Sequence, residues 1–349
     1  MSNGEFKMKN LDGKRILVTG GTGSLGRVLL RRLLTGEQGS PKQIVIFSRD
    51  ETKQHAMRME YLNRFAAVDE ETYHRFQEQV TFRIGDIRDF HSISTALRGI
   101  DVLFNAAAMK QVPSCEYFPY EAVQTNISGP ANIVRAVREL NLPLETVVSI
   151  STDKACKPVN VMGMTKAIQE RIFVQANLEC PQTRFVCVRY GNVLASRGSV
   201  IPLFHEQIKN GGPVTLTTKA MTRFLLSLDQ AVDLVFAALH DGQPGETYVP
   251  RVPSARITDV AAVLIEDRPV DIKVIGIRPG EKIHEILISE EEMYRTVIRG
   301  EYLVILPGLA ELREGGPLEP VLEKEYSSGD ALMSPQEVRE LLAKNNLLI

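Results

Sequence analysis

Short apolar runs alternate with longer amphipathic segments along the first half of the chain. Runs rich in Val, Ile, Leu and Phe predict strands at residues 15–19, 43–47, 80–84, 102–105, 147–150 and 185–189. Apolar residues at helical spacing predict helices at residues 25–34, 92–97, 121–140 and 163–175. This alternation is typical of a parallel sheet with helices on both faces, so we predict an α/β fold with a doubly wound sheet.

The second half of the chain has a looser pattern. After about residue 192, turn signals interrupt it at Gly211-Gly212-Pro213, Pro244-Gly245 and Pro279-Gly280. We predict a first domain over residues 1–191, with its core from about residue 14, and a smaller C-terminal α/β cap domain over 192–349. Some segments of the second part are expected to return to the first domain. Residues 67–79 are charged and aperiodic, which predicts an irregular surface excursion.

A glycine-rich turn lies between the first predicted strand and the first predicted helix. It reads Thr19-Gly20-Gly21-Thr22-Gly23-Ser24-Leu25-Gly26. Gly20 permits a tight turn, Gly23 lets the backbone approach a pyrophosphate, and Gly26 lets the helix pack closely on the strand. The helix N-terminus faces the negative charge. In this context the motif predicts a Rossmann-type sheet whose first domain binds a nicotinamide dinucleotide.

The ends of the next three strands supply further candidate cofactor contacts. Ser48 and Arg49 end the second strand and offer a hydroxyl and a guanidinium for a ribose 2′-phosphate, where an NAD site usually has a carboxylate. NADP is therefore favoured, while Asp50 keeps NAD as the alternative and Arg49 could also be an ordinary solvated residue. A carboxylate after the third strand suits the adenine amino group, and small residues end the fourth. These candidates are Asp86, Ile87, Ala106, Ala107 and Ala108.

Composition and charge restrict the class of protein. The 349 residues are 44% hydrophobic and carry a formal net charge of −2, so neither nucleic acid nor an anionic membrane is favoured as a partner. No apolar run approaches the length of a spanning helix and the first ten residues are polar, so we expect a cytoplasmic protein without membrane insertion. The four cysteines and six histidines are scattered, so neither a disulfide framework nor a metal site is expected.

The most informative chemistry follows the fifth predicted strand. It comprises Ser151-Thr152-Asp153-Lys154 and, further along, Met162-Gly163-Met164-Thr165-Lys166. Short-chain dehydrogenases, whose glycine spacing this chain shares, carry a Tyr four residues before the Lys, so that one helical turn brings phenol and ammonium together. Met162 takes the Tyr position here, and a thioether neither gives nor takes a proton at neutral pH. Met162 could equally be a helix residue that only packs.

Further motifs occur in the order found in one family. They are Ala106-Ala107-Ala108-Met109-Lys110-Gln111-Val112-Pro113, Ser151-Thr152-Asp153-Lys154-Ala155, Arg189-Tyr190-Gly191-Asn192-Val193, Arg197-Gly198-Ser199-Val200-Ile201-Pro202, Met221-Thr222-Arg223-Phe224 and Gly276-Ile277-Arg278-Pro279-Gly280-Glu281-Lys282. From about Lys14 to the C-terminus, the chain resembles the UDP-N-acetylglucosamine 4,6-dehydratases, polysaccharide biosynthesis proteins of the extended short-chain dehydrogenase superfamily. Members that invert the sugar C5 keep the Tyr, whereas the configuration-retaining branch resembles this chain in carrying Met. Many relatives carry an N-terminal membrane region, which we do not expect here.

The resemblance implies a reaction with a tightly bound, recycled cofactor. The sugar is oxidised at C4, water leaves from C5 and C6, and C6 is then reduced. The C5 proton needs a base and the C6 hydroxyl an acid, for which Asp153 and Lys154 are the implied pair. Lys154 as the base requires a lowered pKa, which we expect from burial or the nearby Lys166 cation. Thr152 would bind a substrate oxygen and Lys166 the nicotinamide ribose, while the group that replaces the phenol stays open.

The resemblance also implies a site for UDP-N-acetylglucosamine. It places the diphosphate near Asn192, Arg223 and Arg278 and the uridine ribose near Glu281, because guanidinium groups suit pyrophosphate oxygens and a carboxylate suits a ribose diol. The other implied substrate contacts are Lys110, Arg197, Ser199 and Val200. A homo-oligomer is implied as well, through the helices predicted at 121–140 and 163–175, with a product used in cell-surface glycan synthesis.

Three alternatives to a configuration-retaining dehydratase stay open. A C5-inverting dehydratase would share most of these motifs. A UDP-hexose 4-epimerase needs a base at the C4 hydroxyl but no acid at C6, and it is disfavoured because Met162 removes its main base. A non-catalytic dinucleotide-sensing protein is supported by the missing Tyr, but Lys166 and the sugar-nucleotide motifs argue against it.

Overall fold

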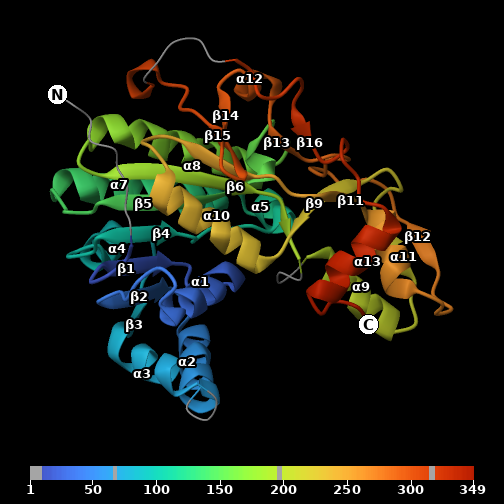
Figure 1. Cartoon of the computed structure of the whole chain (residues 1–349), viewed down its shortest axis with the longest axis horizontal. Coiled ribbons are helices and arrows are strands. Elements are labelled where there is room, and N and C mark those ends of the chain that lie inside the picture. Colours follow the sequence, from blue (N-terminus) through green and yellow to red (C-terminus); the bar gives the residue numbers. More distant parts are fainter. Residues whose placement is uncertain (1–9, 66–68, 195–198, 314–318) are drawn as a thin grey trace.

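The computed structural model describes residues 10–65, 69–194, 199–313 and 319–349, and its centre is a nine-stranded sheet (Figure 1). The strands are β1 (Arg15–Thr19), β2 (Gln43–Ser48), β3 (Val80–Ile84), β4 (Val102–Asn105), β5 (Thr146–Thr152), β6 (Arg184–Tyr190), β10 (Thr247–Pro250), β14 (Thr296–Arg299) and β15 (Tyr302–Ile305). Their spatial order is β14-β15-β10-β6-β5-β4-β1-β2-β3. The strands from β3 to β10 are parallel, whereas β15 runs antiparallel to both of its neighbours.

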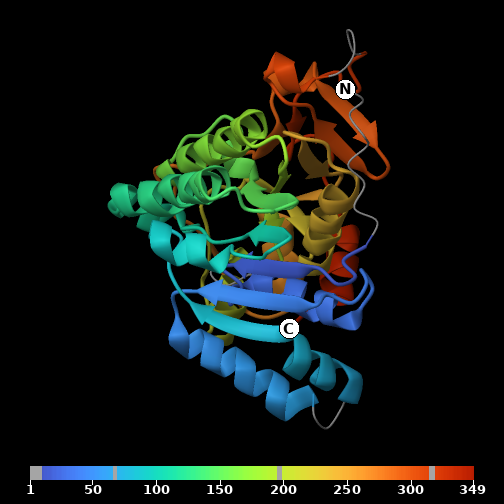
Figure 2. The same cartoon turned by 90° about the vertical axis from the view of Figure 1, so that its left-hand side faces the viewer.

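Helices cover both faces of this sheet. One face packs on α1 (Ser24–Thr35) and α10 (Leu228–Asp241), and the other on α4 (Phe90–Ala96), α7 (Gly129–Glu139) and α8 (Val161–Glu179). Figure 2 shows the green helices α7 and α8 on one side of the strands and the gold helix α10 on the other. Within β1, Ile16 and Val18 face the first group of helices and Leu17 the second, and none of the three is exposed. The predicted Rossmann-type, doubly wound α/β fold is therefore confirmed.

The strand order reverses between β1 and β4. Ligands of open parallel sheets bind at the carboxyl ends of the strands at such a reversal. Asn105 ends β4 here, and its Oδ1 accepts a hydrogen bond from the Thr19 hydroxyl at 2.8 Å. Gly20 follows with a φ of 63°, and a Cβ there would lie 2.8 Å from backbone atoms of Ala106 and Ala107. The chain therefore needs glycine at this point of the ligand-binding edge.

A third hydrophobic core, apart from the two on the sheet, lies in the second half of the chain. It involves β7 (Asn192–Val193), α9 (Val200–Lys209), β8 (Val214–Leu216), β9 (Thr222–Leu226), β11 (Ser254–Arg256), α11 (Ile257–Ile265), β12 (Ile272–Val274) and α13 (Pro335–Lys344). Phe204, Leu264 and Leu342 are fully buried in it. Two short strands, β13 (Ile286–Ile288) and β16 (Tyr326–Ser327), pair in an antiparallel ribbon. The short helix α12 (Glu290–Met293) follows β13 in the sequence. Three later strands, β10, β14 and β15, belong to the main sheet, and α10 packs on it. The domain boundary at residue 192 stays a prediction.

Two helical regions differ from the sequence-based expectation. The prediction of an irregular excursion at 67–79 is wrong from residue 70 on, because the helix α3 (Glu70–Gln79) forms there. It follows another helix, α2 (Glu51–Glu60). Asp69 caps α3 by accepting from the Thr72 N–H at 3.0 Å, and Phe76 stacks on Tyr61 with ring centroids 4.5 Å apart. A cap and one anchored ring thus stabilise a helix whose exposed face is charged.

The helix expected at 121–140 is interrupted. It consists of α6 (Pro119–Val123), a π-helical turn over Gln124–Ser128 and α7, and it follows the short α5 (Val112–Tyr117). Such π-turns often occur at functional sites, and this one contains two buried polar residues, Thr125 and Asn126. In the described ranges, no helix combines the length and the apolar character needed to cross a membrane.

Candidate active site

A cleft of about 460 Å³ opens at the ends of β1 to β4. The predicted cofactor contacts that line it are Gly20, Thr22, Ser48, Arg49, Asp86, Ile87, Ala107 and Ala108. Phe47, Lys53, Gly85 and Thr125 also line it and were not predicted. The structure thus brings most of the predicted cofactor residues to one cleft, although they come from four separate strand ends.

The glycine-rich turn connects this cleft to the N-terminus of α1. Gly23 is the N-cap of α1 without a side-chain cap, and Ser24 and Leu25 begin the helix. The first N–H groups of the helix therefore have no capping side chain and suit an anion. A Cβ on Gly26 would lie 2.4 Å from the carbonyl oxygen of Gly21, so the helix can approach the turn only with glycine there.

The end of β2 presents cations to the cleft while its carboxylate is engaged. Asp50 caps α2 by accepting from the Lys53 N–H at 2.9 Å, and it also pairs with the Lys53 ammonium, which lowers the pKa of Asp50. The half-exposed Arg49 lies 3.7 Å from Asp86, which Arg88 also holds at 2.7 Å. Arg49 and Lys53 therefore both line this end of the cleft, each beside a carboxylate.

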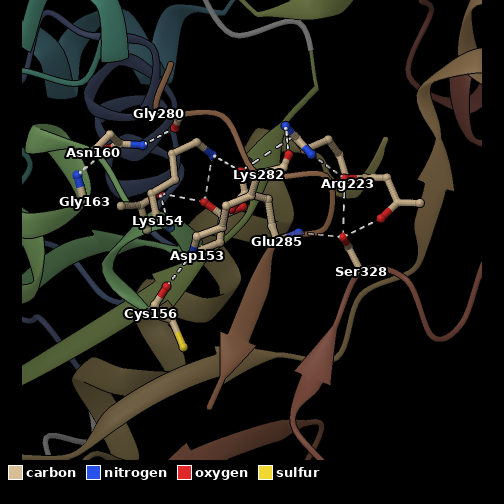
Figure 3. Close-up of polar contacts among 12 residues, drawn as sticks. Asp153, Lys154, Cys156, Asn160, Gly163, Arg223, Gly280, Lys282, Glu285 and Ser328 are labelled. Atoms are coloured by element: carbon tan, nitrogen blue, oxygen red, sulfur yellow. Dashed lines mark hydrogen bonds and ion pairs between the residues drawn. The ribbon is translucent and has the colours of Figure 1, made fainter. Parts of the chain in front are cut away.

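The proton-transfer candidates lie in a single 3-10 turn, Asp153–Ala155, directly after β5 (Figure 3). The Lys154 ammonium is 3.0 Å from Asp153 Oδ1 and 3.2 Å from Glu285 Oε1. The Thr152 hydroxyl donates to the same Asp153 oxygen at 2.9 Å. Asp153 has no exposed surface, whereas 19% of the Lys154 side chain is exposed. A substrate can therefore meet Lys154 and Thr152, and Asp153 lies behind both.

The charge of Lys154 differs from the expectation. Burial alone would lower the pKa of Lys154, but the carboxylates of Asp153 and Glu285 outweigh burial and raise this pKa above its usual value. The predicted lowering of the Lys154 pKa is therefore wrong. Asp153 contributes most to this rise, and Glu285, a carboxylate from a distant part of the sequence, adds to it.

Two predicted active-site residues lie on α8. Lys166 donates to the carbonyl oxygen of Ile150 at 2.5 Å and to Gln169 Oε1 at 2.7 Å, and burial lowers the pKa of Lys166 to about 8. Met162 is 5% exposed and packs in a small apolar cluster with Cys115 and Ala122. Met162 therefore acts here as a packing residue and brings no proton-transfer group to the turn after β5.

The start of α8 is tied to a loop that carries two predicted substrate contacts. Asn160 caps α8 by accepting from the Gly163 N–H at 2.8 Å, and its Nδ2 donates to the carbonyl oxygen of Gly280 at 2.7 Å. The turn around Gly280 contains Arg278 and Glu281, and the Arg278 N–H points to Glu281 Oε2 at 3.4 Å. This link places both residues in a turn docked on the helix that carries Met162 and Lys166.

Arg223 occupies a different environment from the one expected of a diphosphate contact. Its guanidinium is buried and donates to the carbonyl oxygens of Thr222, Lys282 and Ile283 at 2.6, 3.0 and 3.1 Å. Its Nε lies 3.7 Å from Glu285. Arg223 therefore joins the charge cluster around Lys154 rather than facing solvent.

The remaining predicted substrate contacts are spread over three segments. Asn192 Oδ1 and Ser199 Oγ are buried and have no hydrogen-bond partner among the described residues. Val200 begins α9 and packs against the third core, and Lys110 is exposed after β4. Arg197 lies outside the described residues.

Sequence reasoning missed three buried polar residues near the predicted site. Glu285 contacts Lys154, and Gln169 contacts Lys166. Asn126 donates to the Met109 carbonyl oxygen and to the Thr165 hydroxyl, so it bridges the end of β4 and α8. The sequence did contain a signal for Glu285, because a carboxylate directly before a short apolar strand indicates a buried charge. Within the described ranges, no group of three acidic, Cys or His residues could hold a metal ion.

The sequence has close relatives over nearly its whole length. Residues 16–307 match the family described as "Polysaccharide biosynthesis protein". The chain is 43% identical to "Uncharacterized membrane protein MJ1061" of Methanocaldococcus jannaschii, over 96% of this chain and 97% of that protein. It is 41% identical to a "UDP-glucose 4-epimerase" of Rickettsia conorii, over 94% of this chain and 95% of that protein.

Solved structures share the fold. Pen from Bacillus thuringiensis is 33% identical, with a TM-score of 0.86 over 97% of this chain and 99% of that one. DesIV from Streptomyces venezuelae, a dTDP-glucose 4,6-dehydratase solved with NAD and TYD bound, is 20% identical, with a TM-score of 0.64 over 77% of this chain and 86% of that one. At this lower identity the second likeness shows the fold alone.

Proposed function

The chain belongs to the polysaccharide biosynthesis protein family, and from that premise we propose that it is a UDP-N-acetylglucosamine 4,6-dehydratase that retains configuration at C5. The carrying observation is the Lys154 ammonium held between two carboxylates, where the usual phenol is replaced by a buried Met162. Elimination of water needs proton transfer at both C5 and C6. Lys154 with Asp153 can supply both without a phenol.

A nicotinamide dinucleotide fits the cleft at the ends of β1 to β4. Gly20 lets the turn after β1 lie directly against the backbone of Ala106 and Ala107 at the edge of the cleft, and Thr125, which lines the cleft, has a buried Oγ1 with no hydrogen-bond partner among the described residues. When bound, the nicotinamide would supply reversible hydride transfer with the sugar, and the NAD in DesIV supports such a cofactor. Arg49 and Lys53 favour NADP, because Asp50 is engaged as a helix cap; NAD is the alternative.

The proposed proton-transfer roles follow from burial and charge. Asp153 is unexposed, so it exchanges protons with the sugar only through the Thr152 hydroxyl or Lys154. Through Thr152 it takes the C4 hydroxyl proton that a phenol would otherwise take. Lys154 protonates the departing C6 hydroxyl, and the neutral amine that results accepts the C5 proton. The proton stored on Asp153 returns to C5 through Lys154, so the cycle gains and loses no proton.

The nucleotide half of the substrate is assigned to residues outside this turn. Asn192 and Ser199 offer buried, unpartnered oxygens, and Arg278 and Glu281 lie on the turn docked at α8. Arg223 is reassigned to the charge cluster because its N–H groups bind backbone carbonyls. Lys110, Val200, Lys166 and Arg197 keep their predicted roles as proposals.

A second candidate function is UDP-glucose 4-epimerase. It is favoured by the name of the Rickettsia relative, which is 41% identical. An epimerase oxidises and reduces only C4, so it has no use for an acid at C6. The ammonium of Lys154 and its two carboxylates therefore argue for elimination rather than epimerisation.

One incubation separates these functions. The purified protein is mixed with UDP-N-acetylglucosamine in deuterated water, first without added cofactor and then with NADP or NAD, and product mass and the sugar proton spectrum are followed. Loss of one water, deuterium at C5 and gluco geometry support the proposal, whereas inverted geometry at C5 indicates the inverting dehydratase. An unchanged mass with a galacto product, from this substrate or from UDP-glucose, indicates an epimerase. No turnover under any condition indicates a dinucleotide-binding protein without this activity.

The decisive variant is Lys154→Met, with the exposed Lys209→Met as its matched control. Loss of a positioned acid or base typically lowers the rate by about 10²- to 10⁴-fold. We expect Lys154→Met to lose water elimination while it still binds the dinucleotide. Normal dehydration by this variant would remove the basis of the proposal.

We also propose that the chain forms a homo-oligomer through α8 and the neighbouring α5–α6 region. Met164, Ile168 and Leu178 are each more than two-fifths exposed and recur at helical spacing on α8. Tyr117 and Tyr120 add exposed aromatic surface at α5 and α6. Exposed apolar patches of this kind usually mark interfaces.

A further inference from the structure

Glu285 is a buried carboxylate beside the proposed proton-transfer group. It is 1% exposed and directly precedes β13. Its Oε1 lies 3.2 Å from the Lys154 ammonium and 3.7 Å from Arg223 Nε. Its second oxygen, Oε2, is buried and has no hydrogen-bond partner in the part of the chain that the structure describes. A buried ionised group normally costs free energy unless nearby charges compensate it, so its position between two cations calls for a role.

The backbone of Glu285 is fixed from both sides by Ser328, just after β16. The Glu285 N–H donates to Ser328 Oγ at 2.9 Å, and the Ser328 N–H donates to the Glu285 carbonyl oxygen at 2.8 Å. Ser328 Oγ also lies 2.7 Å from the Thr222 hydroxyl, at the start of β9. Figure 3 shows Ser328 and Arg223 on one side of Glu285 and Lys154 on the other. The carboxylate is thus positioned by segments unrelated to the turn it serves.

We propose that Glu285 is a positioning residue, whose carboxylate acts jointly with Asp153 to hold the Lys154 side chain as an oriented ammonium for proton transfer at the sugar. Asp153 alone could form an ion pair with Lys154 in several geometries, because both belong to the same short turn. A second anion from another segment restricts Lys154 to the line between the two carboxylates. The role of Glu285 in the sugar chemistry rests on the proposed function. Its effect on the charge of Lys154 does not.

The cluster explains why removal of Glu285 would change Lys154. With Glu285 in place, two anions and two cations alternate in the order Asp153, Lys154, Glu285, Arg223. Without Glu285, Lys154 and Arg223 share one buried region with a single carboxylate, that of Asp153. An opposite charge within about 4–6 Å favours the charged form of a lysine, so removal of Glu285 lowers the Lys154 pKa.

Other titratable groups around the pair must be considered in any pH experiment. Lys282 donates to the carbonyl oxygen of Cys156 at 2.6 Å, and burial lowers its pKa. The imidazole of His284 lies 2.8 Å from the Thr222 hydroxyl. The groups facing Lys154 and Glu285 are therefore Asp153, Arg223, Lys282 and, one contact further out, His284. A measurement specific to Lys154 is required to separate its titration from theirs.

The first experiment measures the reactivity of the Lys154 amine without any substrate. The full-length protein is treated with acetic anhydride at about pH 8, where only neutral amines react, and acetylation of each lysine is followed by mass spectrometry. Glu285→Gln should acetylate at Lys154 tenfold or more faster than the wild type, while lysines other than Lys282, which also faces Glu285, keep their rates. Glu291→Gln, an exposed glutamate nearby, is the matched control and should leave Lys154 unchanged. General unfolding would instead accelerate all lysines.

The second experiment measures catalysis. Glu285→Gln should lower kcat for water loss by about 10²-fold or more with little change in KM, and Glu285→Asp should recover part of it. The alkaline limb of the kcat profile should move to lower pH if Lys154 acts as an acid. If the wild type does not dehydrate UDP-N-acetylglucosamine, the proposed function fails while the acetylation test still decides the role of Glu285.

Equal Lys154 acetylation in the wild type and Glu285→Gln would overturn the inference. If Glu285→Gln does not fold, Glu285→Asp carries the same test. Its side chain is one methylene shorter, so the 3.2 Å ion pair must lengthen and Lys154 acetylation must accelerate. An unchanged rate in that variant would equally reject the role.

Discussion

Gly163→Ala offers a sharp test of how the turn after β5 is packed. Gly163 is the third residue of α8, and in an exposed helix interior this change stabilises a protein by about 0.5–1 kcal/mol. A Cβ at this position would lie 2.2 Å from the carbonyl oxygen of Lys154 and 3.0 Å from its carbonyl carbon. Both are backbone atoms that cannot rotate away. We therefore expect a loss of stability where helix propensity predicts a gain.

The size of this loss of stability follows from the distance between the added Cβ and the carbonyl oxygen of Lys154. Ordinary Cβ contacts begin at 3.4 Å, so α8 and the Lys154 turn must separate by about 1 Å. Overpacking of this kind typically costs about 1–3 kcal/mol of the free energy of unfolding. A misplacement of about 1 Å at a reacting group costs about 10²-fold in rate. We expect both effects and a smaller change in dinucleotide affinity, because Lys166 is the one proposed cofactor contact on α8 and the residues lining the cleft belong to other elements.

The assay combines urea denaturation, dinucleotide fluorescence titration and kcat for water loss from UDP-N-acetylglucosamine. Gly308→Ala is the matched control, since a Cβ there would meet nothing closer than the Arg171 side-chain end at 3.7 Å. That variant should match the wild type in all three measurements. Gly163→Ala with wild-type or greater stability and an unchanged kcat would refute the reasoning.

Four further predictions concern other parts of the molecule. Arg49→Ser should weaken NADP binding about tenfold and leave NAD binding within about twofold in fluorescence titrations; equal losses for both would reject a 2′-phosphate role. Arg189→Met should lower the free energy of unfolding by about 3–5 kcal/mol in urea, because it leaves Glu170 and Glu292 buried without their shared cation; a loss below about 1 kcal/mol would contradict this. Burial alone would raise the pKa of Glu292, but Arg189 outweighs it and lowers this pKa to about 2. The stability this carboxylate contributes above pH 4.5 should therefore be lost as the pH falls toward 2, and Glu292→Gln should flatten that part of the stability curve. Ile168→Glu should reduce the mass seen by light scattering to that of one chain, and an unchanged oligomer would exclude the α8 face.

The sheet was predictable because its strands carry a local signal. β1, β3 and β4 begin and end where the apolar runs do, at Arg15–Thr19, Val80–Ile84 and Val102–Asn105. Parallel strands buried on both faces appear as continuous apolar segments bounded by polar or glycine residues. α3 escaped this logic, because only two of its residues are buried and most of the others are polar or charged. Its stability depends on Phe76 meeting Tyr61, a contact between separate helical segments.

The cofactor cleft was predictable to the extent that its residues follow strands. Each of the lining residues predicted from the sequence stands at the carboxyl end of β1, β2, β3 or β4, where topology collects ligand contacts. Thr125 lies in a π-turn within a predicted continuous helix, and no local pattern marked that turn. Lys53 was missed for a similar reason, since it belongs to the first turn of a helix that had not been predicted.

The charge of Lys154 shows why the division of roles could not be predicted from the motif. Burial and the nearby Lys166 suggested a lysine with a lowered pKa, and burial does act in that direction. The opposite outcome comes from the carboxylates of Asp153 and Glu285 together, and Glu285 reaches Lys154 from a distant segment held by Ser328 and Arg223. A chain with the same Asp-Lys pair and no carboxylate at the position of Glu285 would hold a lysine of lower pKa, better suited to act first as a base. In the proposed mechanism the Asp-Lys motif therefore supplies the groups that exchange protons, whereas the second carboxylate, Glu285, favours an ammonium on Lys154 at the start of the cycle.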